Sequence, residues 1–316
     1  MTTRRLRIDH IGLQASLQDF GRFGYLAQGV TRGGPLDESA FLWGNRLLAN
    51  HPRAAQLEIL MGQFRATFLA DTAIAVCGAE VSVEVDGRTC PLWQSIAVKA
   101  GQQLSIGMAS AGLRVYLAIA GGFQATAQLG SVSTVSREHL GGLQQNGETL
   151  QAGDEIDFAA APQATVGRRI GWAYRPQYQQ TPTIGLLPGY QYELFSDSAR
   201  ALLVAHEYQL QQDSNRMGIR LQGSAITIDQ QQHGLLSEGL AIGALQVPPD
   251  GQPIVMMHDR QTLGGYPKLG FVNPLDLSLL AQRRPGQTIR FHWQQLSTVT
   301  QQVRRFYRFF GITAPY

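Results

Sequence analysis

The strongest constraint on the fold of this chain is a series of short β-prone segments, each ended by a glycine, Asp-Gly or proline turn. The clearest are four to six residues long and rich in β-branched residues. They are Thr72–Cys77, Val81–Val85, Gln103–Ile106 and Arg114–Ile119. In the second of them valine alternates with Ser82 and Glu84, which places three valines on one strand face. Because helices are few, we predict a mainly β fold, a barrel or a sandwich rather than a doubly wound sheet.

Turn sequences support this interpretation. Asp86-Gly87 directly follows the valine strand and is the strongest hairpin signal in the sequence. A second pattern, a glycine turn, a polar residue and then alternating apolar positions, occurs three times. The copies are Ala100–Ile106, Ala152–Phe158 and Pro285–Phe291. One copy would be ordinary turn chemistry, whereas three favour a repeated barrel.

Four segments have the capping residues or the spacing of helices. The last has apolar residues at helical intervals from Leu296 to Phe310, so we expect an amphipathic helix. Its arginines, Arg304, Arg305 and Arg308, are the densest charged cluster of the chain, and a solvated helix face explains them most simply. The other helices are expected at 37–50, 196–208 and 276–285.

Length and composition indicate a folded protein of about two domains. The chain has 316 residues, and 44% of them are hydrophobic, which is ample for a packed core. The stretch 159–169 is small, polar and unpatterned, and it is the best candidate for a linker. We therefore predict two β subdomains, at 1–165 and 166–316.

Charge, hydropathy and cysteine content exclude several classes of protein. The net charge of +3 is scattered without a block of like charges, so nucleic acid is not an expected partner. No apolar run approaches the ~18 residues of a membrane helix, and the N-terminus lacks an apolar signal segment. Two cysteines are too few for a disulfide framework. We expect a cytoplasmic protein that does not bind membranes.

The sequence lacks the standard motifs of nucleotide, metal and hydrolase sites. It has no GxxxxGK[ST] loop, no GxGxxG before a helix, no HExxH, no paired CxxC and no GxSxG. The seven histidines are dispersed, so their spacing gives a metal site no support, and we predict no metal.

The sharpest candidate for a functional segment is the loop Thr262–Lys268. Gly264 and Gly265 free its backbone for positive φ or for close approach of a ligand. Tyr266 precedes a proline, which restricts it to extended conformations, and Lys268 supplies a positive charge. Such a loop suits an anionic or amide-bearing small ligand. A tight hairpin with a solvated lysine is an equally good interpretation.

Further polar groups lie in neighbouring segments of the second half. Those that we include in the candidate site are Asn215, Arg216, Gln246, Asp259 and Arg260. The planar guanidinium of Arg216 suits a carboxylate or phosphate, although a structural arginine bonded to backbone carbonyls fits equally well. Glu238 could act as a general base, with a solvated carboxylate as the simpler interpretation.

Short motifs run in order along nearly the whole chain. In the first half they occupy 18–25, 35–37, 44–47, 57–59, 116–122 and 129–134. In the second half they occupy 187–189, 214–218, 237–239, 246–248, 250–255 and 264–268. Each is weak alone, but the ordered series resembles the family called allophanate hydrolase subunit 2, or biotin-dependent carboxyltransferase-like proteins.

The resemblance implies a fold, an activity and partners. The fold would be two cyclophilin-like β-barrel subdomains, the second with the amphipathic C-terminal helix. The activity would be that of one component of an ATP-dependent 5-oxoprolinase complex, which hydrolyses 5-oxo-L-proline to L-glutamate. The partners would be a subunit-1 homologue, similar to the B component of 5-oxoprolinase, and a LamB/YcsF-like protein, its A component. The chain alone would be inactive, and the complex would consume ATP at a site of unknown location.

Two other activities occur in the family, and the motifs do not separate them. One is the carboxyltransferase component of a biotin-dependent urea carboxylase-type enzyme, and the other is a non-enzymatic regulator that binds a sensor kinase. The length of the chain, without a biotin domain, favours the 5-oxoprolinase complex. From residue chemistry we expect the catalytic residues to be Asp259, Arg260 and Lys268. Binding residues would be Asn215, Arg216, Gln246, Gly264, Gly265 and Tyr266.

Overall fold

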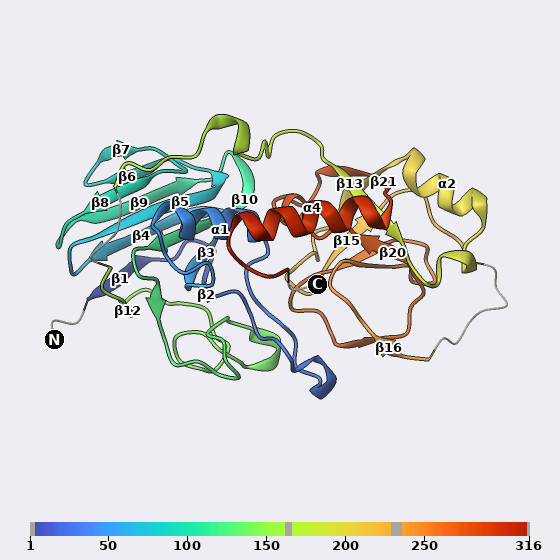
Figure 1. Cartoon of the computed structure of the whole chain (residues 1–316), viewed down its shortest axis with the longest axis horizontal. Helices are drawn as coiled ribbons and strands as arrows, with labels where there is room; N and C mark the ends of the chain where they lie inside the picture. Colours follow the sequence, from blue (N-terminus) through green and yellow to red (C-terminus); the bar gives the residue numbers. More distant parts are fainter. Residues whose placement is uncertain (1–3, 162–165, 229–235, 315–316) are drawn as a thin grey trace. The chain divides into compact units, whose positions relative to one another are not determined.

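A computed structural model describes residues 4–161, 166–228 and 236–314 and confirms a mainly β fold with few helices (Figure 1). Contacts divide the chain into two compact units. Unit 1 comprises Met1–Phe23 and Gly33–Gln179, and unit 2 comprises Gly24–Arg32 and Gln180–Tyr316. Among the described helices, none is long and apolar enough to cross a membrane.

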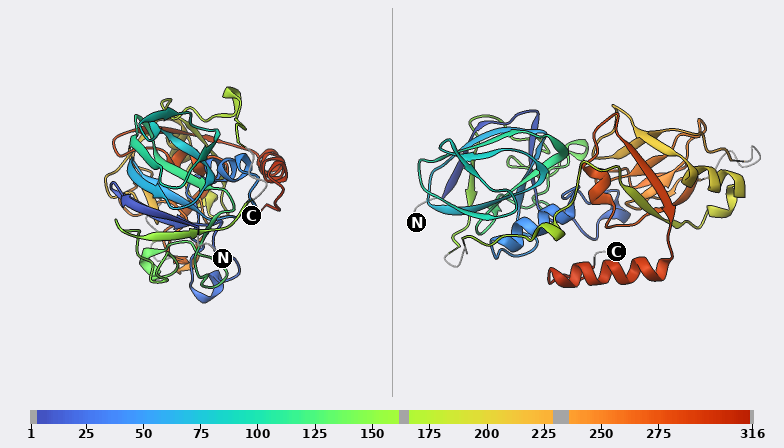
Figure 2. Two further views of the ribbon diagram at one scale, coloured as in Figure 1. Left: turned by 90° about the vertical axis from the view of Figure 1, so that its left-hand side faces the viewer. Right: turned by 90° about the horizontal axis from the view of Figure 1, so that it is seen from above.

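Unit 1 consists of two antiparallel sheets. Its strands are β1 (Arg5–His10), β2 (Gln14–Gln18), β3 (Gln56–Leu60), β4 (Gly62–Phe68), β5 (Thr72–Glu80), β6 (Val83–Val85), β7 (Arg88–Cys90), β8 (Ser95–Val98), β9 (Gln103–Met108), β10 (Ala111–Ile119), β11 (Phe123–Gln124) and β12 (Glu155–Phe158). The larger sheet has the order β11-β12-β1-β4-β9-β6-β7, and the smaller has the order β2-β3-β10-β5-β8. The right-hand view of Figure 2 shows these strands around a common interior.

The core of unit 1 lies between its two sheets. Leu6 and Ile8 of the larger sheet and Leu57 and Ile59 of the smaller belong to one buried apolar cluster. Strand β5 is buried on both faces because helix α1 (Glu38–Leu47) contacts it in addition to the core. A strand covered on both faces reads as a continuous apolar run rather than an alternating one, as β5 does.

The predicted turns have the backbone geometry that their sequences require. Asp86 and Gly87, which join β6 to β7, both have positive φ, 49° and 73°, as a two-residue hairpin turn demands. The glycines of the three repeated segments, Gly101, Gly153 and Gly286, also have positive φ, between 84° and 97°. The repeat is therefore a left-handed glycine turn that leads into a strand, used in both units.

The chain after the predicted linker packs on unit 1. The linker at 159–169 includes 162–165, which lie outside the described residues, and the contact division falls after Gln179, beyond the boundary expected at 165/166. Ser95 N–H donates to the carbonyl of Arg168 at 2.9 Å. Further on, the hydroxyl of Tyr178 donates to Asp37 Oδ2 at 2.9 Å. Asp37 also caps α1, because its Oδ1 accepts from Ala40 N–H.

Unit 2 contains a closed barrel and a two-stranded sheet. The barrel strands are β13 (Thr183–Pro188), β14 (Glu207–Leu210), β15 (Gly218–Gln222), β17 (Ala244–Gln246), β18 (Ile254–Met256), β20 (Lys268–Val272) and β21 (Thr288–Trp293). They close in the order β13-β20-β17-β18-β15-β14-β21. Strands β16 (Glu238–Gly239) and β19 (Leu263–Gly264) form the small sheet.

Three α-helices in the described part of unit 2 confirm the remaining helix predictions. They are α2 (Asp197–Ala205), α3 (Leu277–Ala281) and α4 (Leu296–Phe309). Ser196 caps α2 by accepting from Ala199 N–H at 3.2 Å. Asp276 precedes α3, but its carboxylate accepts from Gly185 N–H of β13 at 2.7 Å instead of capping the helix. That bond ties α3 to the barrel.

Candidate functional site

The ammonium of Lys268 is enclosed by the loop that it ends. Its side chain is only 1% exposed. The ammonium donates to Glu238 Oε1 at 2.7 Å, to the Tyr266 carbonyl at 3.2 Å and to the Gly264 carbonyl at 3.3 Å. These bonds use all three of its N–H groups. The ammonium of Lys268 is therefore not solvated, contrary to the simpler interpretation of the sequence. It bonds Glu238 and two carbonyls of the loop 262–268 to one another.

Glu238 is the exposed end of this cluster. Besides Lys268, its Oε1 accepts from the Tyr190 hydroxyl at 2.6 Å and from Gln191 Nε2 at 2.7 Å. The hydrogen bond from Lys268, followed by that from Tyr190, lowers the pKa of Glu238 below its ordinary value. Gln191 also accepts from the Lys268 backbone N–H at 2.7 Å. The result is a fixed surface carboxylate whose side chain is 36% exposed.

Sequence reasoning missed Tyr190 and Gln191. They belong to the segment after β13, more than forty residues before Glu238 along the chain. The only available signal was the Leu187-Pro-Gly189 motif that immediately precedes them. No spacing within the sequence links this motif to the loop.

Limited space, rather than a left-handed backbone, favours glycine at 264. Neither Gly264 nor Gly265 has a positive φ, so the expectation of a left-handed backbone at these positions is wrong. A Cβ at 264 would lie 2.7 Å from Gln246 Nε2 and 3.2 Å from Leu240 Cδ2. The buried Gln246 amide also lies 3.4 Å from the Tyr266 carbonyl. The group that approaches Gly264 is therefore Gln246 of the same chain, and the close approach of a ligand stays a prediction.

The Arg216 guanidinium is occupied by Asp259. Nε donates to Asp259 Oδ2 at 2.8 Å and Nη2 donates to Oδ1 at 3.0 Å, so the pair is bidentate. Asp259 is 5% exposed, and its backbone N–H also donates to the Arg216 carbonyl. Asn215 is exposed and accepts from Met217 N–H at 2.8 Å, which fixes the turn before β15. The arginine thus binds a carboxylate of its own chain.

Arg260 is connected to the loop through Leu240. Its side chain is 1% exposed, and Nε donates to the Leu240 carbonyl at 2.7 Å. The Leu240 backbone N–H in turn donates to the carbonyl of Thr262 at 2.8 Å. The three residues predicted to be catalytic, Asp259, Arg260 and Lys268, are therefore all buried and bonded to groups of unit 2.

Among the predicted site residues, Tyr266 lines a pocket. Its side chain is 46% exposed, and the pocket beside it has a volume of about 610 Å³. The other lining residues are Gln211, Asp213, Arg220, Leu221, Gln222, Pro248, Pro249, Asp250, Gln252, Pro253 and Ile254. Six of these eleven residues have amide or charged side chains, so the pocket is more polar than the mostly apolar lining usual for small-molecule sites.

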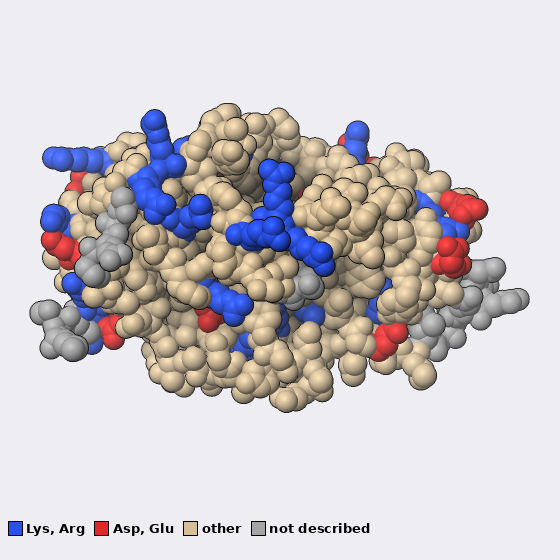
Figure 3. Space-filling model, viewed as in Figure 1, with Lys and Arg blue, Asp and Glu red and all other residues tan. Residues whose placement is uncertain are grey.

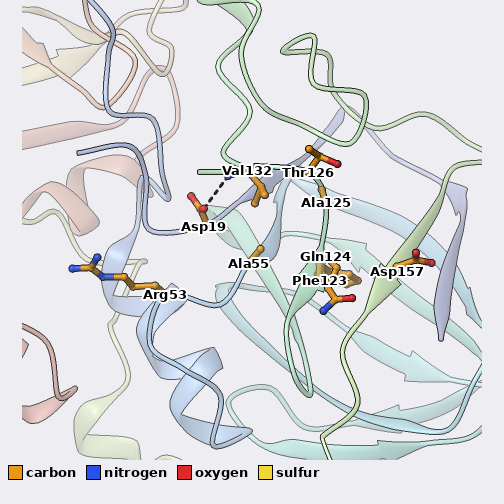
Figure 4. A pocket seen from close by; sticks show the side chains of 9 residues that line it. All are labelled: Asp19, Arg53, Ala55, Phe123, Gln124, Ala125, Thr126, Val132 and Asp157. Atoms are coloured by element: carbon orange, nitrogen blue, oxygen red, sulfur yellow. Dashed lines mark hydrogen bonds between the residues drawn. The ribbon is translucent and has the colours of Figure 1, made fainter. Parts of the chain in front are cut away.

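A second pocket, of about 560 Å³, lies in unit 1 (Figure 4). Its lining includes Asp19, from the motif at 18–25. Asp19 accepts from the hydroxyls of Ser131 and Ser133 and from Val132 N–H at 2.9 Å, the dashed line in Figure 4. Arg53 also lines the pocket, but its guanidinium points away from the other side chains. The Asp19 carboxylate therefore connects the motif at 18–25 to the motif at 129–134 by hydrogen bonds.

Comparison with known proteins identifies the class. Residues 28–293 match the family described as carboxyltransferase domain, subdomain A and B, and the chain belongs to this family. This confirms the resemblance inferred from the motifs. Among curated proteins, the C component of 5-oxoprolinase from Escherichia coli is 35% identical over 292 residues, which cover 90% of each chain.

Larger enzymes contain a region similar to this chain. Urea amidolyase of Lachancea kluyveri is 29% identical over 305 residues, which cover 89% of this chain and 16% of that protein. The crystal structure of K. lactis urea amidolyase superposes with a TM-score of 0.88 at 27% identity, over 96% of this chain and 19% of that one. The chain thus spans nearly all of the 5-oxoprolinase component but less than a fifth of the urea amidolyases.

Proposed function

We propose that this protein is one component of an ATP-dependent 5-oxoprolinase complex that hydrolyses 5-oxo-L-proline to L-glutamate. The observation that carries the proposal is 35% identity to the C component of 5-oxoprolinase over 90% of both chains. Such coverage relates the two proteins over both units rather than through one shared module. The partners would be a subunit-1 homologue, similar to the B component, and a LamB/YcsF-like protein, the A component. The complex would act in the cytoplasm, and this chain alone would be inactive.

The reaction explains the need for ATP. A five-membered lactam is a poor electrophile, and transfer of a phosphoryl group from ATP to its amide oxygen makes the carbonyl carbon more electrophilic. Water adds to that carbon, and the C–N bond then breaks as the nitrogen takes up a proton, which leaves an acyl phosphate. A second water hydrolyses the acyl phosphate to the carboxylate of L-glutamate and phosphate. The sequence contains no standard phosphate loop. We therefore assign the nucleotide to a site of another type, shared with or supplied by a partner protein.

Within this chain, we assign substrate contact to the exposed groups around the loop. Tyr266 borders the pocket of unit 2 and would contact the lactam or the nucleotide, together with the exposed Asn215. Asp259, Arg260 and Lys268 are buried, so they would position these groups rather than touch the substrate. Gln246, packed against Gly264, would support the loop from within.

The test is reconstitution with both candidate partner proteins, followed by an assay of glutamate release with and without ATP. Glutamate from the three-protein mixture, and none from this chain alone, is the expected result. Tyr266→Ala should lower kcat/KM at least tenfold, whereas Thr262→Ser, in the same loop, serves as the matched control. Wild-type activity of Tyr266→Ala would remove the loop from the site.

A second candidate function is carboxyl transfer from carboxybiotin. The TM-score of 0.88 to urea amidolyase over 96% of this chain favours it as the alternative. Co-purification of a biotinylated carrier protein, with no glutamate from the full assembly, would establish this function in place of the first. Binding to a sensor kinase without catalysis in either assay would indicate the regulatory function.

A further inference from the structure

Helix α4 carries three exposed arginines, Arg304, Arg305 and Arg308, which we call the α4 arginine face. At about 100° per residue they fall within roughly 100° of one another around the helix. The buried residues of α4 lie on the other side and include Val303 and Tyr307. Figure 3 shows basic side chains gathered where Figure 1 draws α4.

Intramolecular contacts do not account for this face. Within the described chain, none of the three arginines makes a side-chain hydrogen bond or an ion pair, whereas Arg200 and Arg290 each bind a carboxylate. The partial negative charge at a helix C-terminus acts only over the last turn, so it accounts for Arg308 alone. Arg304 and Arg308 are four residues apart, a spacing at which like charges repel. The cluster therefore costs the isolated helix stability.

The face belongs to a wider asymmetry of charge. Residues 277–316 contain six arginines and neither Asp nor Glu. The preceding 276 residues contain 20 basic residues and 23 acidic ones. The positive net charge of the whole chain therefore arises from its last forty residues. In a chain with only 16% charged residues, this segment is where an acidic molecule would be attracted.

We propose that the α4 arginine face binds an acidic surface of a partner protein in the assembly that the proposed function requires. Planar guanidinium groups bind carboxylates in bidentate fashion, and arginine is enriched in protein interfaces. A membrane is a poorer occupant because Val299, Val303 and Tyr307 are buried. The exposed large apolar side chains of α4, Leu296 and Phe309, lie at its two ends and form no continuous apolar face to insert. Three cations on two turns are also a small footprint for nucleic acid.

The proposal is tested with a triple charge reversal, Arg304→Glu, Arg305→Glu and Arg308→Glu, in the full chain. The matched control reverses Arg65, Arg88 and Arg169, which are exposed in unit 1 and change the net charge equally. Binding to each purified candidate partner is measured by calorimetry at 50 and 300 mM salt, and circular dichroism verifies folding. We expect the α4 variant to bind one partner at least tenfold more weakly at low salt and to lose most of the salt dependence. The control should bind within about twofold of wild type.

The outcomes separate this inference from the function on which it rests. If wild type binds the partners and the α4 variant binds equally well, the inference is wrong and the proposed function stands. If wild type binds neither partner, both fail. Binding of wild type, but not of the α4 variant, to anionic phosphatidylserine vesicles or to a single-stranded oligonucleotide, with assembly of the complex unchanged, would also overturn the inference. If the triple Arg→Glu variant does not fold, the triple Arg→Gln variant at 304, 305 and 308 is used in the same binding measurements, with a smaller change of charge.

Discussion

At the scale of single residues, two cations of the candidate site, Lys268 and Arg216, are neutralised by carboxylates of the same chain. Lys268 lies 2.7 Å from Glu238, and Arg216 lies 2.8 Å from Asp259. A buried ammonium is costly unless it is paired and its N–H groups are bonded, and the loop 262–268 provides both conditions. The energetic role of the lysine is therefore to make one closed conformation of the loop the stable one.

Removing the charge of Glu238 should destabilise the protein, because it leaves the buried ammonium of Lys268 without its counter-ion. We expect Glu238→Gln to lower the free energy of unfolding by about 1–3 kcal/mol, less than for a fully buried pair because Glu238 is partly exposed. Tyr190→Phe removes only one neutral donor and should cost about 0.5–1.5 kcal/mol. Urea unfolding at pH 7 measures both. A Glu238→Gln variant as stable as wild type would contradict the importance of the pair.

The same carboxylate should contribute to acid sensitivity. Its pKa is lowered from the ordinary value of 4.5 in the folded protein, so the folded state binds this proton less readily than the unfolded state. Its contribution is complete above pH 4.5 and is lost as the pH falls through the folded pKa. The difference in unfolding free energy between wild type and Glu238→Gln should therefore shrink between pH 6 and pH 3. A constant difference across this range would show that Glu238 does not titrate as we infer.

At the scale of elements, two short strands hold the candidate loop beside the barrel. Strand β19 pairs with β16, so that Glu238 is opposite Gly264 and Gly239 is opposite Leu263. Strand β20 continues from the loop into the barrel and pairs with β17, which carries Gln246. The loop is therefore fixed at both ends by strand pairing, and Gly264 is the point at which the side chain of β17 approaches it.

Alanine at 264 should disturb the packing of the loop against Gln246, whereas alanine at 239 should be tolerated. The new Cβ at 264 would lie 2.7 Å from the buried Gln246 amide, while a Cβ at 239 has no atom within 4 Å. We expect Gly264→Ala to cost about 1–3 kcal/mol and Gly239→Ala to change stability by less than about 0.5 kcal/mol. Chemical denaturation of the two variants provides the comparison. Equal midpoints would show that the contact with Gln246 is not constraining.

At the scale of the whole molecule, the order of the chain does not follow the division into units. Gly24–Arg32 precedes most of unit 1 in sequence but belongs to unit 2. The Thr31 hydroxyl donates to the His258 carbonyl at 2.8 Å, in a buried part of unit 2. His258 immediately precedes Asp259 and Arg260, so this early segment is hydrogen-bonded to the residue next to two of the predicted site residues.

Thr31→Val should therefore destabilise unit 2 although residue 31 is near the N-terminus. Valine has nearly the shape of threonine but leaves the His258 carbonyl without this donor, so we expect a loss of about 1–2 kcal/mol. Thr31→Ser keeps the hydroxyl and should retain the hydrogen bond at a small packing cost. The rate of amide hydrogen exchange at residues 257–260, which should rise in Thr31→Val, shows whether the loss of stability is local to this segment. Unchanged exchange there in Thr31→Val would show that the segment does not support the site.

Local features of the sequence predicted much of the fold. Alternating valines, the Asp86-Gly87 turn, the capping residues Asp37 and Ser196, and the glycine before each repeated strand all act within a few residues. Such effects do not depend on distant parts of the chain. The loop at 262–268 was likewise identified from its glycines, its proline and its lysine.

The sequence by itself thus determined the type of most elements and the glycine turns, because these depend on backbone preferences over short distances. Only the tertiary structure decided which charges pair. Lys268 meets a carboxylate 30 residues away, and Arg216 meets one 43 residues away. Those partners are set by strand register around the barrel, which brings distant residues within hydrogen-bond distance and leaves Tyr266 exposed at the pocket.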